Sequence, residues 1–542
     1  MKDRYLNRIK NNWKAGVTVA LVSIPLSVSL AVASGGTPIQ GIITAIWAGL
    51  IASIFGGSVF NIVGPAGALS GILAGFALKN GYALLPNIAI VAGVLILIAY
   101  LIRLEKYLVY ISSSVVHGFT LGVAFMIAWG QINSALGLTG IKAHEKFLQN
   151  LLESYSHIST FSLHTFIVFS VFLVGLFLVL KYLPKLPSVL VLTPFGIILG
   201  YLSTNNFINL NIATLGSKFA NLSGSLFAGY KFGINSEVLV TSLTVAIVAI
   251  LETMLSAKIA DGMTKTKYNK RKEMLGLGLA NIVSGLFGGI PATGVLARTS
   301  LNVKSGARSK MSATINSLTI AVVSLLLLSY FKYIPLSVIA AILMFVAYRM
   351  VDPKHYVNLW HFDKKGFFIA MLVALVTIFD DPIIGIMTGT IISLLILVEK
   401  ISRGQFEIIL NNKNTGIVHR SEGDYLDEIK KRGDTLVYSI KGQLLHLNTL
   451  NHLTRFESGL NGYKNIIIRL RELYFIDVDG VECISEIIED CKKQKRKIVI
   501  TGVNEFIKGL LKESKEFREL EDDGLIFNKT SDALKYFGYK IK

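Results

Sequence analysis

The sequence predicts a polytopic α-helical membrane protein that ends in a small α/β domain. Its 542 residues are 52% hydrophobic and 16% charged, with a mean hydropathy of +0.56, which is well above the range of soluble globular chains. Apolar runs of about 15 to 22 residues recur from Trp13 to Ile401, each near the length that a helix needs to cross a bilayer. From about Gly404 the pattern changes to charged, alternating strands and helices.

Fourteen apolar runs within residues 1–403 are interpreted as membrane spans. Their expected limits are 15–34, 41–56, 64–78, 87–103, 110–132, 164–183, 188–202, 237–259, 273–288, 293–303, 310–330, 334–351, 366–379 and 382–401. The third and tenth runs are too short and too rich in glycine to cross the bilayer as whole helices. We therefore interpret these two runs as half-helices.

The excess of positive charge indicates topology rather than a nucleic-acid-binding surface. Residues 1–405 hold 31 basic and 13 acidic residues, whereas residues 406–542 hold 23 and 22. With the N-terminus in the cytoplasm, the cytoplasmic loops of residues 1–365 carry 23 basic residues and the outer loops 6, as the positive-inside rule requires. We expect both termini in the cytoplasm, the protein in a bacterial cytoplasmic (inner) membrane, and no nucleic-acid partner.

The third and tenth runs also resemble each other. "GPAGALS" from Gly64 and "PATGVLARTS" from Pro291 both place proline, alanine and glycine where an apolar helix begins. Aligning Pro65 with Pro291 gives a shift of 226 residues, which carries the first span onto the eighth. Because the two repeats, about 12–202 and 237–401, contain seven spans each, they should lie in the membrane with opposite orientations, as in transporters built from inverted repeats.

The half-helices predict an anion site. A helix that begins at the bilayer midplane leaves its first N–H groups unpaired and directs the positive end of its dipole into the gap, so two such ends attract an anion. Glycines near the start let an anion approach the backbone, Thr293 and Ser70 add hydroxyl donors, and Arg298 adds a positive charge. The alternative is a pair of proline-kinked packing helices, with Arg298 reaching the cytoplasmic surface.

Glu252 is the only acid inside the apolar run of the eighth span. An intramembrane carboxylate is costly and is treated as functional by default. Ser256 lies four residues later, on the same helical face. We predict that Glu252 binds the coupling cation, most simply a proton, or neutralises Arg298 when substrate is absent. A permanent Glu252–Arg298 pair that only sets packing is the alternative.

The tail, residues 404–542, is expected to form one small cytoplasmic α/β domain. It has no phosphate-binding glycine loop and no catalytic dyad, so no enzymatic activity is expected. The two cysteines of the chain, Cys483 and Cys491, lie here without zinc spacing, and neither a metal site nor a disulfide is expected. Asp477 and Asp479 lie where a strand leads into a helix N-terminus.

Four motifs carry a family resemblance: "AGVTVALVSIPLSVSLAVASGGTP", "GGSVFNIVGPAGALSG", "HGFTLGVAFMIAWGQ" and "GLFGGIPATGVLARTSLNVKSGARS". They resemble the core motifs of the SulP anion transporters, the family of sulfate permeases, bicarbonate transporters and prestin, and the tail resembles the STAS domain of that family. The resemblance covers nearly the whole chain. It implies fourteen spans in 7+7 inverted repeats, a UraA-like core and gate, an elevator-type motion, and a homodimer in the lipid bilayer.

The resemblance also implies which residues bind the anion. Leu26 and Leu30 match positions where several relatives have glutamine and an aromatic residue, and Ala66 replaces an aromatic residue of some relatives. The implied substrate-binding set is Leu26, Leu30, Gly64, Pro65, Ala66, Gly67, Ala292, Thr293, Gly294 and Arg298. Glu252 and Ser256 match the acid and the hydroxyl that hold sodium in a bicarbonate-transporting relative. Glutamate rather than aspartate at this position favours protons.

The tail departs from the STAS pattern at one position. The loop that reads D-x-[ST]-G in phosphorylated relatives reads "DVDG" here, so Asp479 puts a fixed negative charge where they carry the phosphorylated hydroxyl. We expect a trafficking, dimerisation or regulatory module that binds a cytoplasmic protein partner. An inert folded tail is the alternative.

We therefore expect secondary active transport of a small inorganic or carboxylate anion, of the sulfate, bicarbonate or dicarboxylate class. The expected coupling ion is H+, with Na+ as the alternative, and no other cofactor is expected. A passive anion channel and a membrane anion sensor that signals through the STAS domain are the competing functions. Nucleobase transport fits the same fold, but the arginine and the anionic preference of the site oppose it.

Overall fold

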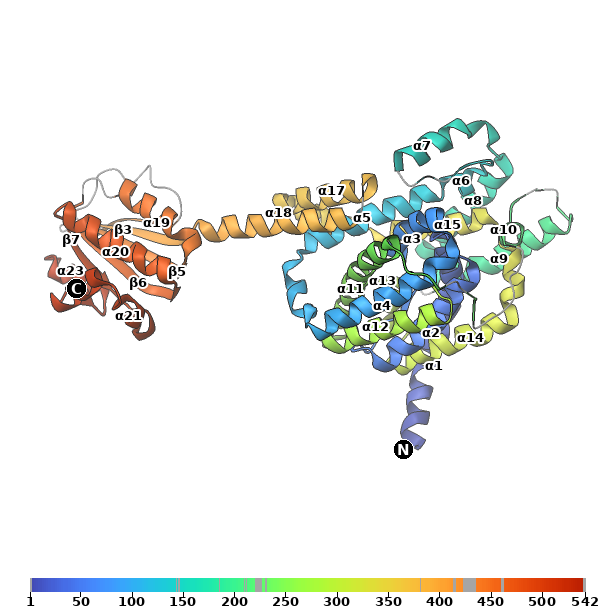
Figure 1. Ribbon diagram of the computed structural model, residues 1–542, viewed down its shortest axis with the longest axis horizontal. Coiled ribbons are helices and arrows are strands. Elements are labelled where there is room, and N and C mark those ends of the chain that lie inside the picture. Colours follow the sequence, from blue (N-terminus) through green and yellow to red (C-terminus); the bar gives the residue numbers. More distant parts are fainter. Residues whose placement is uncertain are drawn as a thin grey trace. The chain divides into compact units, whose positions relative to one another are not determined.

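A computed structural model describes residues 2–539 except 143, 145–146, 185, 209, 211, 220–226, 230–231, 381, 413–415, 423–434 and 460–462. The chain forms two compact units, Met1–Ser393 and Leu394–Lys542. The first unit is helical and the second is an α/β domain (Figure 1). Each unit is described by itself below.

The first unit contains eighteen labelled α-helices in its described residues, the last of which runs on into the second unit. Its first half comprises α1 (Lys2–Ala33), α2 (Pro38–Phe55), β1 (Val63–Gly64), α3 (Gly67–Asn80), α4 (Leu85–Leu101), α5 (Ser113–Gly130), α6 (Ile132–Leu136), α7 (Phe147–Ser156), α8 (Leu163–Tyr182), α9 (Ser188–Thr204) and α10 (Leu215–Lys218). Its second half comprises α11 (Ser236–Thr264), α12 (Lys270–Leu286), β2 (Thr293–Gly294), α13 (Leu296–Lys304), α14 (Met311–Leu327), α15 (Leu336–Met350), α16 (Pro353–Phe362), α17 (Lys364–Phe379) and α18 (Pro382–Ser402).

Helices occupy all fourteen segments that the sequence predicts, which confirms a polytopic helical protein. Among the described residues, eight helical stretches are long and apolar enough to cross a membrane by length and composition, so the count of fourteen spans stays a prediction. The third and tenth segments are short, as predicted. At about 1.5 Å per residue, the 14 residues of α3 and the 9 of α13 reach only part of the way across a hydrocarbon core of about 30 Å.

Helix packing divides the first unit into two groups. Helices α1, α2, α4, α11, α12 and α14 pack on one another, while α5, α15 and α17 pack together with α8. Segments from the two halves of the sequence interleave, so that the blue α2 and α4 lie beside the green α12 (Figure 1). This interleaving agrees with the predicted core and gate, because each group takes helices from both repeats.

The two half-helices begin where β1 and β2 cross. The strands pair antiparallel, with Val63 opposite Gly294 and Gly64 opposite Thr293. This antiparallel pairing is what two repeats of opposite orientation produce. The N-cap residues of α3 and α13, Ala66 and Val295, are 229 residues apart. The alignment shift of 226 is therefore wrong by three residues, because the proline of the first repeat follows its strand whereas the proline of the second precedes its strand.

The second unit has one six-stranded sheet of order β4-β3-β5-β6-β7-β8. Strands β4, β3 and β5 pair antiparallel, and β5 to β8 pair parallel. The strands are β3 (Gln405–Asn412), β4 (Gly416–Glu422), β5 (Thr435–Leu444), β6 (Asn465–Ile476), β7 (Lys497–Thr501) and β8 (Ile526–Phe527). The helices are α19 (His446–Gly459), α20 (Val478–Lys493), α21 (Glu505–Leu511), α22 (Lys515–Asp522) and α23 (Thr530–Tyr536).

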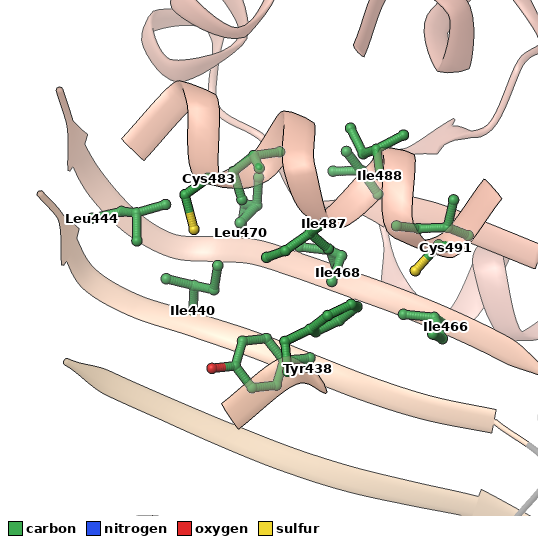
Figure 2. Close-up of a cluster of buried hydrophobic side chains, with 14 of the residues drawn as sticks. Tyr438, Ile440, Leu444, Ile466, Ile468, Leu470, Cys483, Ile487, Ile488 and Cys491 are labelled. Carbon is green, nitrogen blue, oxygen red and sulfur yellow. The ribbon is translucent and has the colours of Figure 1, made fainter. Parts of the chain in front are cut away.

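The main core of this domain lies between the sheet and α20. Cys483, Ile487 and Cys491 point from α20 onto the strands, against Ile440 and Ile466 among others (Figure 2). Both cysteines are free and buried, and burial raises the pKa of each thiol to about 12. They behave as small apolar core residues rather than as reactive thiols.

Candidate functional site

Neither half-helix carries a side-chain cap. Ala66, before α3, and Val295, before α13, both have extended backbone angles, and neither has a side-chain oxygen to offer to the first turn. In the described part of the chain, the amide groups that open these helices are therefore not satisfied in the usual way, by a serine, threonine, aspartate or asparagine. Two positive helix ends are left uncapped on either side of the strand crossing.

Arg298 lies in the first turn of α13 and is 1% exposed. Its Nε and Nη2 atoms have no hydrogen-bond partner among the described residues. Its Nη1 atom lies over Gly64 of the opposite strand, where an added Cβ would be only 2.7 Å away. The alternative in which this arginine reaches the cytoplasmic surface is wrong, because the side chain is buried. A buried guanidinium with free N–H groups is costly unless acceptors meet it, which makes this position suited to an anion.

A cavity of about 60 Å³ lies at the helix starts. It is bordered by the first turns of α3 and α13, through Ala68 and Leu296, and by Glu252 of α11. The opposite wall belongs to the other helix group. It consists of Val115, Val116, Phe119 and Thr120 of α5, Met350 of α15 and Ile386 of α18. One water-sized particle needs only about 10–15 Å³, so a small ion fits between the two groups.

Glu252 is half-buried at this cavity. Its Oε2 atom accepts a hydrogen bond of 2.6 Å from the Thr293 hydroxyl. No direct ion pair joins Glu252 and Arg298 within the residues that the structure places, so the alternative of a permanent pair is not what this conformation shows. The carboxylate borders the cavity and the guanidinium lies over Gly64 of β1, so the two charges attract each other without a direct contact.

The other predicted residues of the tenth segment are held by protein groups. Ala292 exchanges two hydrogen bonds with the Asn281 side chain, at 2.8 and 3.0 Å. The Gly294 N–H donates to the Thr253 hydroxyl at 2.8 Å. These contacts fix the path of β2. The next residue that borders the cavity is Leu296, the first residue of α13, which the sequence interpretation missed.

The predicted residues of the first repeat are buried around the start of α3. Leu26 and Leu30 are 7% and 2% exposed and follow Pro25, which lies inside α1. A Cβ on Gly67 would meet Leu30 at 3.7 Å and Ile127 at 2.7 Å. A side chain at this position would require the end of the Ile127 side chain to move. Pro65 and Ala66 are buried between β1 and α3 and complete the predicted set.

Ser256 is fully buried one turn after Glu252 and donates toward the Asn61 Oδ1 atom at 2.7 Å and the Thr299 hydroxyl at 2.9 Å. The sequence interpretation also missed this network, which includes Glu273. Asn61 precedes the glycine-proline motif by three residues, and this closeness to the predicted anion site could have identified it. Glu273 follows a run of basic residues, which made it resemble part of a solvated face.

Asp479, the predicted regulatory residue, lies in the first turn of α20 with a side chain 51% exposed, and its Oδ2 atom is 3.4 Å from His446 Nδ1. Asp477 caps the helix by accepting from the Gly480 N–H at 2.8 Å. The structure thus places a carboxylate on the surface where α20 begins. Its regulatory role stays a prediction.

Comparison with known proteins settles the family. Residues 9–373 match the sulfate permease family, and residues 428–533 match the STAS domain. The chain belongs to the sulfate permease family. This family is one of transporters, in agreement with the expectation that the chain is not an enzyme.

Two relatives align with almost the whole length of this sulfate permease family member. A Bacillus subtilis protein named for sulfate transport, YvdB, is 30% identical over 530 residues, which is 96% of each chain. The bicarbonate transporter BicA of Picosynechococcus sp. is 24% identical, over 98% of this chain and 95% of BicA. Both the recognition of the family and the assignment of a STAS domain are thereby confirmed.

Similar solved structures confirm the fold. Murine Slc26a9, an anion transporter solved in the inward-facing state, superposes with a TM-score of 0.79 at 14% identity, covering 97% of this chain and 91% of that one. The transmembrane domain of a cyanobacterial BicA gives a TM-score of 0.59 at 22% identity, covering 71% and 97%. At these identities the likeness establishes the architecture of the chain and not its substrate.

Proposed function

We propose that this protein is a secondary active transporter of a small anion, of the sulfate, bicarbonate or dicarboxylate class, in a bacterial cytoplasmic membrane. The observation that carries the proposal is Arg298, a fully buried guanidinium beside two uncapped half-helix starts, two of whose nitrogens have no partner among the described residues. These are groups that bind negative charge. The names of relatives, which include sulfate and bicarbonate transporters, support this class of substrate.

We propose further that anion uptake is coupled to a proton carried by Glu252. Its carboxylate borders the same cavity as the helix starts. In a site of low dielectric, an ionised carboxylate repels an incoming anion, whereas a protonated one does not. Binding of the anion and binding of the proton therefore favour each other. The Thr293 hydroxyl, which donates to this carboxylate, couples the protonation state to the strand beside Arg298.

Access would alternate by an elevator-type motion. Both half-helices belong to one helix group together with α1 and α11, and α5 and α15 supply the opposite wall of the cavity. A rigid-body displacement of the first group would carry the site from one side of the membrane to the other. The family fold includes the STAS domain, for which we propose a regulatory role through a cytoplasmic protein partner and dimerisation of the transporter.

Uptake into proteoliposomes tests the proposal. Purified protein would be reconstituted and supplied with labelled sulfate, bicarbonate, succinate or chloride, with and without an imposed pH or sodium gradient. We expect saturable accumulation of at least one anion that depends on an inward proton gradient. Flux that does not saturate and follows only the membrane potential would identify a channel. Binding without flux would identify a sensor.

Glu252→Gln tests the coupling. Wild-type uptake should rise as the external pH falls, by up to about tenfold per pH unit for one required proton, because the carboxyl must be protonated to admit the anion. The amide mimics the protonated carboxyl, so the variant should transport with little dependence on pH. Glu237→Gln, at the exposed start of the same helix, is the matched control and should retain the wild-type profile. A Glu252→Gln variant with the wild-type pH dependence would refute proton coupling at this residue.

A further inference from the structure

We propose that Glu273 is a positioning residue that fixes the orientation of the Asn61 side-chain amide. Through that amide, it sets the direction of the hydrogen bonds made by Ser256 and Thr299 behind the candidate anion site. The consequence for transport rests on the proposed function, in which α11 carries the coupling ion. The consequence for hydrogen bonding follows from the contacts themselves.

Glu273 lies in the first turn of α12 and is 3% exposed. Its Oε2 atom accepts from the N–H groups of Gly57 and Ser58, both at 2.6 Å, and its Oε1 atom accepts from Asn61 Nδ2 at 2.7 Å. All three partners are donors. An ionised carboxylate, which only accepts, meets all three at once, and a neutral amide in the same place cannot.

The orientation of the Asn61 amide follows from its neighbours. One end faces the Glu273 carboxylate at 2.7 Å and the Thr253 carbonyl oxygen at 3.3 Å. Neither of these groups can donate a hydrogen, so this end of the amide is the NH2 group. The carbonyl end, Oδ1, consequently faces the hydroxyls on α11 and α13.

These hydroxyls are the ones next to the site. Ser256 Oγ lies 2.7 Å and Thr299 Oγ1 2.9 Å from Asn61 Oδ1, and the two hydroxyls are 2.9 Å from each other. Thr299 Oγ1 also accepts from the Ile62 N–H, at 3.0 Å. The hydroxyl hydrogens of Ser256 and Thr299 are therefore used within this network. The remaining lone pairs of Ser256 are left to accept a bond from a proton donor or a cation.

The network also touches the backbone of the site. A Cβ on Gly294 would lie 2.6 Å from Asn61 Nδ2, so the amide packs directly on β2. The Val295 N–H donates to the Ile62 carbonyl oxygen at 2.8 Å, which joins the two strands just before α13 begins. A rotation of the Asn61 amide therefore changes the groups presented at β2 as well as at α11.

Glu273→Gln would force that rotation. To satisfy the Gly57 and Ser58 N–H groups, the glutamine must turn its oxygen toward them and its NH2 group toward Asn61. Asn61 must then turn its own oxygen toward residue 273 and its NH2 group toward Ser256. The hydroxyl hydrogen of Ser256 is displaced outward, and its lone pair is no longer available to a coupling ion.

The experiment compares Glu273→Gln with the exchanged pair Glu273→Gln/Asn61→Asp. The aspartate of the pair can accept from the glutamine NH2 group with one oxygen and from both hydroxyls with the other, which restores the direction of the hydroxyl bonds. The bond to the Thr253 carbonyl oxygen is lost, because an aspartate oxygen has no hydrogen to donate to it. The readouts are the half-saturating proton or sodium concentration and the KM for the anion. We expect the single variant to raise the half-saturating concentration of the coupling ion about fivefold or more and to change the anion KM by less than about twofold. The pair should recover part of this loss, because the hydroxyl bonds are restored and the bond to the Thr253 carbonyl oxygen is not.

The control is Glu237→Gln. Glu237 also accepts from an asparagine, Asn80 Nδ2 at 2.5 Å, but at the exposed start of α11, and its loss should change neither value. An unchanged ion dependence in Glu273→Gln overturns the proposal, as does an exchanged pair no better than the single variant. If the single variant does not fold, a folded pair with wild-type ion dependence supports the proposal, and a pair that also fails to fold overturns it.

The anion transport function and this inference can fail separately. A wild-type protein that accumulates no anion under any gradient contradicts the proposed function. In that event, the shift in melting temperature on adding sodium or acid is compared between the purified wild type and both variants. A response that is lost in Glu273→Gln and regained in the pair still supports the inference, and equal responses in all three proteins overturn it.

Discussion

The starts of the two half-helices have the same backbone conformation but carry different side chains. Each follows a two-residue strand, and each begins at an apolar residue that cannot cap it, Ala66 before α3 and Val295 before α13. In α13 the first turn carries a buried arginine, and the strand before it is bonded to α11 and α12 through side chains. In α3 the first turn is Gly67, Ala68, Leu69 and Ser70, and the serine hydroxyl bonds back to its own helix.

This difference indicates that the two repeats contribute different groups to the site. The second repeat supplies the charge and the polar anchoring, and the first repeat supplies space and uncapped backbone. The two repeats depend on each other at Gly64. Because Gly64 has no side chain, Arg298 Nη1 of the second repeat can lie across β1 of the first. An anion held at the crossing would meet a side-chain cation from one repeat and a helix end from each.

Arg298→Ala is expected to have the largest effect, because it removes the charge that only the second repeat supplies. A charge-assisted hydrogen bond contributes about 1.5–3 kcal/mol, so the KM for the anion should rise by about 10- to 150-fold. Uptake kinetics in proteoliposomes measure this change. Arg349→Ala, at an exposed position in the last turn of α15, is the control and should behave as wild type. Equal losses in both variants would mean that general charge, and not this site, attracts the anion.

Gly64→Ala tests the space that the first repeat supplies. The new Cβ would lie 2.7 Å from Arg298 Nη1, so the end of the arginine must move while the backbone can stay in place. We expect a KM about tenfold higher with a melting temperature close to that of wild type. Gly75→Ala, later in α3, has no atom within 4 Å among the residues described, and it should leave the KM unchanged and stabilise the helix by up to about 1 kcal/mol.

Val295→Thr is expected to have the smallest effect and tests whether the uncapped amides matter. The two side chains have nearly the same shape, and threonine can cap the first turn of α13 with its hydroxyl oxygen. A cap stabilises a helix by about 1 kcal/mol, so we expect higher thermal stability together with a KM about fivefold higher, as the hydroxyl competes with the anion. A more stable variant with an unchanged KM would show that the amides of α13 do not contact the substrate.

The sequence by itself determined the class, the two domains and the location of the crossing. Hydropathy reports helices of membrane length directly, and a short glycine- and proline-containing run between longer ones indicates a broken helix. Glu252 and Arg298 could be singled out because charge in an apolar run is rare. Such signals depend on local composition, which needs no knowledge of the fold.

Only the tertiary structure decided how the two repeats align with each other and which polar groups form hydrogen bonds. The prolines suggested one alignment, but the pairing of Val63 with Gly294 and the helix starts define another, because backbone geometry rather than residue identity is repeated. Glu273 and Asn61 are 212 residues apart in sequence, and their hydrogen bond forms because the segment between α2 and β1 lies against the first turn of α12 in the folded protein. A carboxylate beside a basic run gives no sign of being buried, since burial depends on neighbours that the chain brings in from elsewhere.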